Sequence, residues 1–145
     1  MNGINVGRWI LGGFAAGAVT WVIEGLAGSF YLADMNAALA AHNLTMTMDT
    51  GTFAGSLFVS LVAGLVLVYI YALARARFGP GPRTAVVAAI TLWTGGYLVS
   101  LMGYNMMGLF PSRLLITWAL VGLVEMVLAG LVGGWIYREE HAVGA

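Results

Sequence analysis

Four long apolar stretches dominate this chain and restrict it to a small set of folds. Each is longer than the ~20 residues that an α-helix needs to cross the hydrocarbon core of a bilayer. They occupy residues 10–32, 53–74, 85–107 and 114–137. Apolar residues make up 61% of the chain and charged residues 8%, against roughly 45–50% and about 25% in soluble domains. The sequence therefore predicts an all-α transmembrane bundle of four antiparallel helices, forming one domain over residues 1–145.

The first apolar stretch follows a short segment that contains Arg8, as the core of a secretory signal does. A signal's apolar core is only about 7–15 residues long. This stretch is longer and contains Glu24. We therefore expect it to be retained as the first spanning helix.

The arginines are divided unevenly between the two ends of the predicted helices. Arg113 stands alone at one end, and the other end has Arg8, Arg75, Arg77, Arg83 and Arg138. Cytoplasmic segments of membrane proteins are enriched in Lys and Arg. Both termini are therefore predicted to be cytoplasmic, and the bacterial plasma (inner) membrane is the expected location.

The first external segment, residues 33–50, is longer than the other connections and has no basic residue. Its part from Asp34 to His42 has helical composition and is predicted to form a short interfacial helix that stops at Asn43. The second external connection is brief. There Pro111 and Ser112 are expected to begin the fourth helix.

Small residues recur at helical spacing in all four stretches. In a membrane, small side chains mark the faces on which helices pack, because they allow two backbones to approach closely. The glycines predicted at such contacts are Gly13, Gly17, Gly28, Gly64, Gly96, Gly122 and Gly133. Glu24 lies on the same face of the first helix as three of them, and Glu125 shares a face of the fourth helix with Gly122.

Four polar side chains, one from each predicted helix, fall at a similar depth. Counting ~1.5 Å per residue from the nearest cytoplasmic arginine places all of them about 20–24 Å into the membrane. They are Glu24, Ser60, Tyr97 and Glu125. A charged carboxylate at this depth costs at least ~2.5 kcal/mol, and no basic side chain is expected beside it. The protonated acid, hydrogen-bonded to Ser60, Tyr97, Thr20 or the other glutamate, is therefore the expected state of at least one of the two.

Two functions are compatible with this polar layer. In the first, the acids hold the bundle in register, and the protein acts through its lateral surfaces as a homo-oligomer or as an accessory subunit of a larger, energy-transducing membrane complex. In the second, Glu24 and Glu125 carry protons or bind a cation, and the protein is a carrier or channel. The two readings differ in whether the glutamates meet across a polar cavity.

Several other functions are not supported by the residue types present. The chain has no cysteine, and its histidines, His42 and His141, lie outside the apolar stretches, which argues against a haem or metal site. Phosphate-binding loops, nucleophile elbows and HExxH motifs are absent from the sequence, so no enzyme and no cofactor is predicted. A formal net charge of zero with six basic residues argues against nucleic acid as a partner.

The aromatic residues fall into two groups by depth. Trp9, Trp135 and Tyr137 at one end and Tyr31 and Tyr104 at the other are expected to be interfacial anchors. Three others lie deeper, where a packing role is favoured over a wall for a quinone, a pigment or a lipid tail. These are Trp21, Trp93 and Tyr97.

Several motifs together resemble those of a family of small bacterial four-helix integral membrane proteins. They are VGRWILGGFAAG at 6–17, RFGPGPRTA at 77–85, GLFPSRLL at 108–115, and GLVE at 122–125 followed by GGWIYREE at 133–140. The likeness covers nearly the whole chain. It implies a bacterial plasma-membrane protein that keeps Glu125, and it implies no activity. The four-helix glutathione-related membrane enzymes are of similar length, but their arginine-rich pattern is not found in this sequence.

Overall fold

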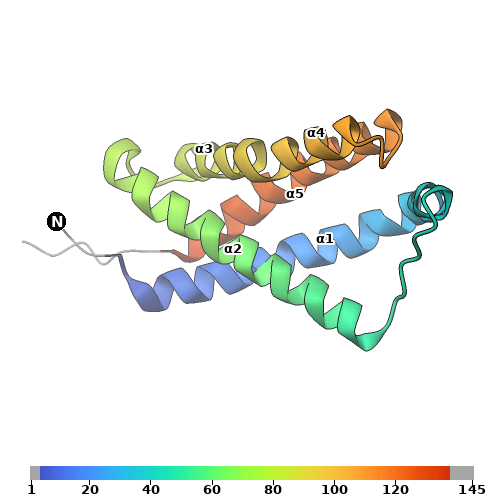
Figure 1. Cartoon of the computed structure of the whole chain (residues 1–145). Helices are drawn as coiled ribbons and strands as arrows, with labels where there is room; N and C mark the ends of the chain where they lie inside the picture. Colours follow the sequence, from blue (N-terminus) through green and yellow to red (C-terminus); the bar gives the residue numbers. More distant parts are fainter. Residues whose placement is uncertain (1–3, 138–145) are drawn as a thin grey trace, which may run out of the picture.

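The computed structural model describes residues 4–137, and all regular structure within that range is helical (Figure 1). Four helical segments there are long and apolar enough to cross a membrane, as the sequence predicts. They are α1 (Val6–Ala41), α2 (Thr50–Phe78), a third segment made of α3 (Pro82–Leu92), the π-helical turn η1 (Trp93–Leu98) and α4 (Val99–Met106), and α5 (Ser112–Ile136). Each begins before the stretch predicted from hydropathy, because polar and small residues cap and extend the apolar cores.

Helix α1 is one continuous helix of 36 residues, so the prediction of a separate interfacial helix from Asp34 to His42 is wrong. Nothing between the two parts ends a helix: residues 33–41 are mostly alanine and other helix-compatible residues, and there is no proline. The helix ends where predicted, since Asn43 adopts a positive φ of 56°, a conformation that a continuing right-handed helix excludes.

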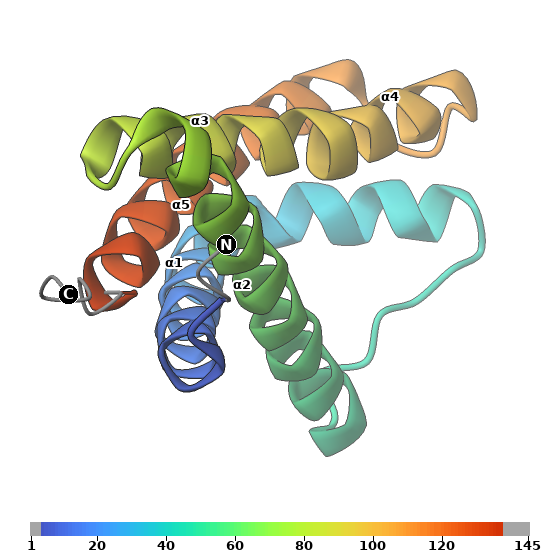
Figure 2. The ribbon, with the colours of Figure 1, turned by 90° about the vertical axis from the view of Figure 1, so that its left-hand side faces the viewer.

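Although continuous, α1 is bent. Its first part, in blue, and its last part, in cyan, run in clearly different directions when Figures 1 and 2 are compared. Gly25, Gly28 and Ser29 lie between the two parts, and such residues are frequent sites of helix bending. A straight helix of this length would measure about 54 Å, well beyond the ~30 Å hydrocarbon thickness, so a bend or a strong tilt is needed to fit it into a bilayer.

Helices α1, α2 and α5 cross at glycines, as the sequence predicts for most of them. A Cβ atom on Gly17 would lie 2.6 Å from the Cα of Leu61, and one on Gly64 would overlap the backbones of Gly13 and Gly17. On the neighbouring side, a Cβ on Gly133 would meet Val68 at 2.5 Å. We call this region, where Gly12, Gly13, Gly17, Gly64 and Gly133 lie, the glycine crossing.

Two glycines predicted at helix contacts are not at any. A Cβ on Gly28 would have no neighbouring atom within 4 Å, and one on Gly96 would meet only Leu92 of its own segment, at 3.7 Å. Gly28 belongs to α1 and Gly96 to η1, and neither position packs closely against a neighbouring helix. Two glycines that the sequence analysis did not select, Gly130 and Gly134 of α5, pack against Ala85 of α3 instead.

One end of the bundle gathers the start of α1, the end of α2, the start of α3 and the end of α5 (Figure 1). The Tyr137 hydroxyl accepts a hydrogen bond from the Asn5 N–H (3.3 Å), and the Tyr71 hydroxyl accepts one from the Gly81 N–H (3.2 Å). We call it the arginine end, after Arg8, Arg75, Arg77 and Arg83. Arg138, also used in predicting the orientation, lies outside the described residues.

The turn from α2 to α3 is tight and contains two Gly–Pro pairs. Gly79 and Gly81 adopt φ values of 80° and 136°, which side chains with a Cβ rarely accept. The Thr84 hydroxyl donates to the Gly79 carbonyl at 2.7 Å. At the other end of the bundle Pro111 precedes the first residue of α5, Ser112, as expected.

Candidate functional site

Helix α5 is the central helix: it contacts α1, α2, α3, η1 and α4. Over the described chain, α1 has no close backbone contact with η1 or α4. A space therefore remains between α1 on one side and η1 with α4 on the other. Helix α5 lies at the base of this space. Of the polar residues selected from the sequence, Glu24 and Tyr97 line this space.

Glu125 of α5 is buried, with 5% of its surface exposed, whereas Glu24 of α1 is exposed on the single chain. The two carboxyl groups lie close enough to interact electrostatically, and both interact with Tyr31 and Tyr97. No hydrogen bond joins the two carboxyl groups directly within the part of the chain that the structure describes.

The hydrogen-bond partner of Glu24 is Tyr31, which the sequence analysis placed at the membrane interface. The Tyr31 hydroxyl donates to Glu24 Oε1. Tyr31 is 6% exposed, and its ring packs against Trp118 with the centroids 5.9 Å apart. The contact of Tyr31 with Glu24 is not among the sequence-based predictions. The signal that would have found it is the spacing of seven residues from Glu24, two helical turns along one face.

A cavity of ≈490 Å³ lies beside Glu24. Its polar lining comes from three segments: Glu24 and Tyr31 from α1, Tyr97, Ser100 and Tyr104 from the third segment, and Trp118 from α5. The rest of the wall is mainly apolar. A concave apolar space with a few converging polar groups is the usual form of a small-ligand site.

Two buried polar atoms at this site have no hydrogen-bond partner among the described residues. They are Oε2 of Glu125 and Nε1 of Trp118. Leaving a buried donor or acceptor unpaired costs about 1–3 kcal/mol, so native structures seldom do it without a functional reason. One atom is an acceptor, or a donor when protonated, and the other is a donor. Each of them can therefore form a hydrogen bond with a bound species.

The π-helical turn η1 positions Tyr97. A Cβ on Gly122 would lie 2.6 Å from the Tyr97 ring, so this glycine makes room for the tyrosine against α5. Such π-turns are often found at functional sites, because the extra residue redirects a side chain. Trp93, in the same turn, donates its indole N–H to the Ala119 carbonyl at 3.0 Å and so connects η1 to α5.

Thr20 and Ser60 are not hydrogen-bonded to either glutamate within the described chain. Thr20 is buried, and its hydroxyl donates to the Gly17 carbonyl of its own helix at 2.9 Å. The Ser60 carbonyl oxygen packs against Gly17 at the glycine crossing. Ser60 therefore lies where α1 meets α2. Residues of different helices that lie at equal depth in a membrane can still face different neighbouring helices.

Trp21, the remaining deep aromatic residue, lies at the α1–α2 contact. Its indole N–H donates to the Ser56 hydroxyl at 3.1 Å, and its ring packs edge-on against Phe53. Of the three deep aromatic residues, Tyr97 is the one that lines the Glu24 cavity.

No group of three His, Asp or Glu side chains in residues 4–137 is arranged to hold a metal ion. His42 lies at the end of α1, and His141 lies outside the described residues. A scan against protein-family models and searches of curated proteins and solved structures found no match to this chain.

Proposed function

We propose that this chain is a multi-pass membrane carrier that binds a proton or a small cation between Glu24 and Glu125. The observation that supports this most directly is the buried Oε2 atom of Glu125, which has no hydrogen-bond partner among the described residues and belongs to the helix at the base of the Glu24 cavity. Two neighbouring carboxyl groups in an apolar setting favour sharing one proton or one cation, because a second negative charge would face the first. No catalytic reaction is assigned to the chain.

The surrounding hydroxyl groups give the proposed ion a path. Glu24 is exposed at one side of the site, and Tyr31 donates to it. Tyr97 lies on the opposite wall of the cavity and interacts electrostatically with both acids. In the proposed cycle, Glu24 exchanges the ion with the cavity and Glu125 holds it in the buried position. The tyrosine hydroxyls stabilise the carboxyl group that carries the charge.

The proposal also includes an orientation. The four segments alternate in direction across the bilayer, with both termini and the arginine end in the cytoplasm of a bacterium. The motif resemblance and the five-to-one division of arginines support this assignment.

A second candidate is an accessory subunit of a larger membrane complex, or a homo-oligomer. The exposed position of Glu24 favours it. On a single chain this carboxyl group would face lipid, which is costly. A neighbouring subunit packed over α1 and the mouth of the cavity would remove that cost.

The two candidates are separated by replacing Glu125 with glutamine and measuring proton and cation flux in liposomes. Gln has the shape of a protonated acid but cannot release a proton, so a carrier should lose its flux while the fold is kept. Asp34→Asn is the matched control, because it removes an exposed acid of α1 that does not line the Glu24 cavity.

Flux that survives Glu125→Gln, or wild-type protein without any flux, rejects the carrier. In that case, isolation of the protein from its native membrane together with its bound partners tests the accessory role.

A further inference from the structure

Four aromatic side chains line the Glu24 cavity, and they come from three spanning segments. They are Tyr31 of α1, Tyr97 of η1, Tyr104 of α4 and Trp118 of α5. The cavity measures ≈490 Å³, within the range of about 300–1,000 Å³ that is usual for sites of small organic molecules. A bare ion would leave most of this volume unfilled. The size of the cavity and its aromatic lining therefore indicate an organic ligand.

Several of these rings hold one another in place. The Trp118 ring packs edge-on against Tyr31, with the centroids 5.9 Å apart, and against Phe110 at 4.8 Å. Phe110 in turn packs against Tyr104 at 5.9 Å. Edge-to-face contacts of this kind stabilise aromatic pairs. The rings are thus positioned before a ligand enters, which reduces the cost of ordering them on binding.

The charge at this cavity is negative. Glu24 is the charged residue of the described lining, which includes no basic side chain. Tyr31 donates a hydrogen bond to Oε1 of this carboxyl group, and the hydrogen bonds formed within residues 4–137 leave Oε2 without a donor. Glu24 is also exposed, so a ligand can reach its carboxyl group. A carboxylate in an apolar setting is stabilised when an opposite charge lies beside it.

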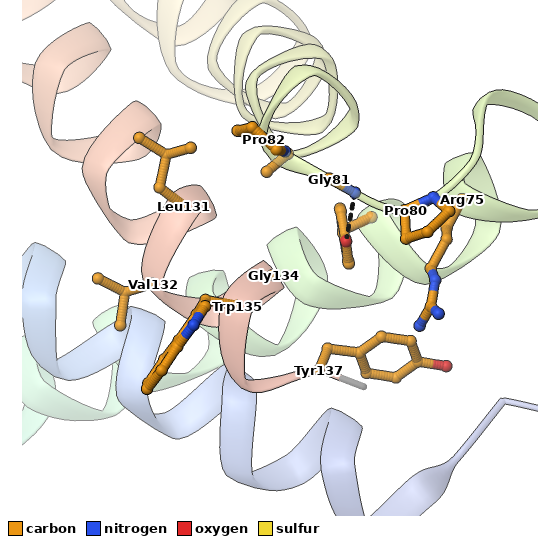
Figure 3. Close-up of a pocket in the computed structure, with 11 residues that line it drawn as sticks. Arg75, Pro80, Gly81, Pro82, Leu131, Val132, Gly134, Trp135 and Tyr137 are labelled. Atoms are coloured by element: carbon orange, nitrogen blue, oxygen red, sulfur yellow. Dashed lines mark hydrogen bonds between the residues drawn. The ribbon is translucent and has the colours of Figure 1, made fainter. Parts of the chain in front are cut away.

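A second cavity, at the arginine end, contains a cation over an aromatic ring that the chain itself provides (Figure 3). It measures ≈600 Å³. There the guanidinium of Arg75 lies over the Tyr137 ring, with Cζ 5.7 Å from the ring centre. Among the described residues, no arginine lies over a ring of the Glu24 cavity. The rings of the Glu24 cavity therefore remain available to the cation of a ligand.

We propose that the Glu24 cavity binds a lipophilic organic cation, such as a quaternary ammonium or phosphonium ion. The Glu24 carboxylate balances the charge, and the aromatic rings attract the cation electrostatically. The apolar lining, which includes Leu92, Leu101 and Met126, contacts the hydrocarbon groups of the ligand. A metal ion fits less well, because no three acids or histidines of residues 4–137 are grouped to hold one.

This assignment rests on the proposed function for the role of Glu24 in transport, and it deepens that function by naming the class of cation. The test uses the full chain in dodecyl maltoside micelles and measures binding by isothermal titration calorimetry, with protein-free micelles as the background. Tetraphenylphosphonium should bind, and tetraphenylborate, which has the same shape and the opposite charge, should not. Equal affinity for the two ions overturns the proposal, because shape and apolar surface alone would then explain binding.

Glu24→Gln should weaken the binding of tetraphenylphosphonium about tenfold, because the opposite charge in an apolar site is lost. Asp34→Asn is the matched control. It removes an exposed acid of the same helix that lines a different cavity, together with Arg113, and it should leave the affinity unchanged. An unchanged affinity in Glu24→Gln overturns the proposal.

The contribution of the rings is tested at Tyr97. Tyr97→Leu should weaken binding about fivefold, because the attraction between the cation and one ring is lost. Tyr97→Phe keeps the ring and should retain most of the affinity. Circular dichroism and gel filtration check that each variant is folded. A loss in Tyr97→Phe as large as in Tyr97→Leu contradicts binding by the ring.

The calorimetric result and the flux result can fail separately. Binding of tetraphenylphosphonium by a protein without flux rejects the carrier and supports the organic-cation site. Proton flux without binding of tetraphenylphosphonium supports the carrier and overturns the organic-cation site.

Discussion

The glycine crossing and the Glu24 cavity are two regions of the same helices with opposite packing. At the crossing, Gly13, Gly17 and Gly64 bring the backbones of α1 and α2 into direct contact. Around the cavity, α1 and α5 instead present Glu24, Tyr31 and Trp118. In a membrane, helices associate through close packing and polar contacts, because lipid is as apolar as the helix surface. Small residues therefore close one region, and large polar rings keep the other open.

Helix α2 contributes to the glycine crossing but contributes little to the Glu24 cavity. Among the described residues that line the Glu24 cavity, Ala63 is the one from α2. Earlier in α2, Phe53 and Phe58 are 54% and 67% exposed. The start of α2 thus does not cover the cavity, which explains why Glu24 remains exposed on a single chain. A rigid crossing next to an open polar site is an arrangement that allows the site to change while the bundle stays assembled.

The largest expected effect comes from filling the crossing. Gly64→Ala places a methyl group against the backbones of Gly13 and Gly17, which cannot move aside as a side chain can. We expect a loss of about 3 kcal/mol in the free energy of unfolding, measured by denaturant titration in micelles. Gly55→Ala in the same helix is the control, because its Cβ has no neighbour within 4 Å. Equal stability of the two variants would show that α1 and α2 are not in backbone contact.

A smaller effect is expected where a glycine faces a side chain at the cavity. Gly122→Ala would push against the Tyr97 ring, which can rotate towards the Glu24 cavity. We expect a loss of about 1–2 kcal/mol in the free energy of unfolding, together with a change in flux if the site is a carrier. Gly103→Ala, whose Cβ also meets nothing within 4 Å, is the control. A loss as large as that of Gly64→Ala would mean that the cavity is as tightly packed as the crossing.

The hydrogen bond between Tyr31 and Glu24 is expected to contribute less. Tyr31→Phe keeps the ring against Trp118 and removes only the hydroxyl. The free energy of unfolding should fall by about 1 kcal/mol, the net value of a single hydrogen bond. Tyr69→Phe, on an exposed residue of α2, should have no effect. If the two variants behave alike, Tyr31 does not hold Glu24 in place.

The smallest effect on stability is expected at Asp49, the N-cap residue of α2, which precedes the spanning segment. The Thr52 N–H donates to Asp49 Oδ1 at 2.8 Å and holds the pKa of this carboxyl group below its usual value. A lowered folded-state pKa means that the cap stabilises the protein at neutral pH and loses this effect as the pH falls through that pKa. The difference in thermal unfolding midpoint between the wild type and Asp49→Ala should therefore become smaller at acidic pH.

Asp49→Asn is the control for the cap, because asparagine caps a helix as well as aspartate does and has no charge to lose. The difference in thermal unfolding midpoint between Asp49→Asn and Asp49→Ala should be independent of pH. A difference between wild type and Asp49→Ala that is constant down to pH ~2 would contradict the role assigned to the Asp49 carboxylate.

Hydropathy and glycine spacing predicted the parts of this protein that depend on local sequence. Uninterrupted apolar runs identify spanning helices because no unpaired backbone group is tolerated in lipid. The periodicity of small residues then identified Gly13, Gly17, Gly64, Gly122 and Gly133. The residues missed, Tyr31 and Trp118, are large and aromatic. In a sequence such residues resemble ordinary anchors or filler, and only their neighbours make them part of a site.

The sequence by itself determined the number of spanning segments, the position of the tight 79–81 turn and the glycine faces of α1 and α5, because each follows from residues close together in the chain. Only the tertiary structure decided that Tyr31, rather than Thr20 or Ser60, reaches Glu24, and that Glu24 and Tyr97 line one cavity. Counting residues gives depth in a membrane but not the rotation of each helix or the bend in α1. Those depend on how all the helices pack together.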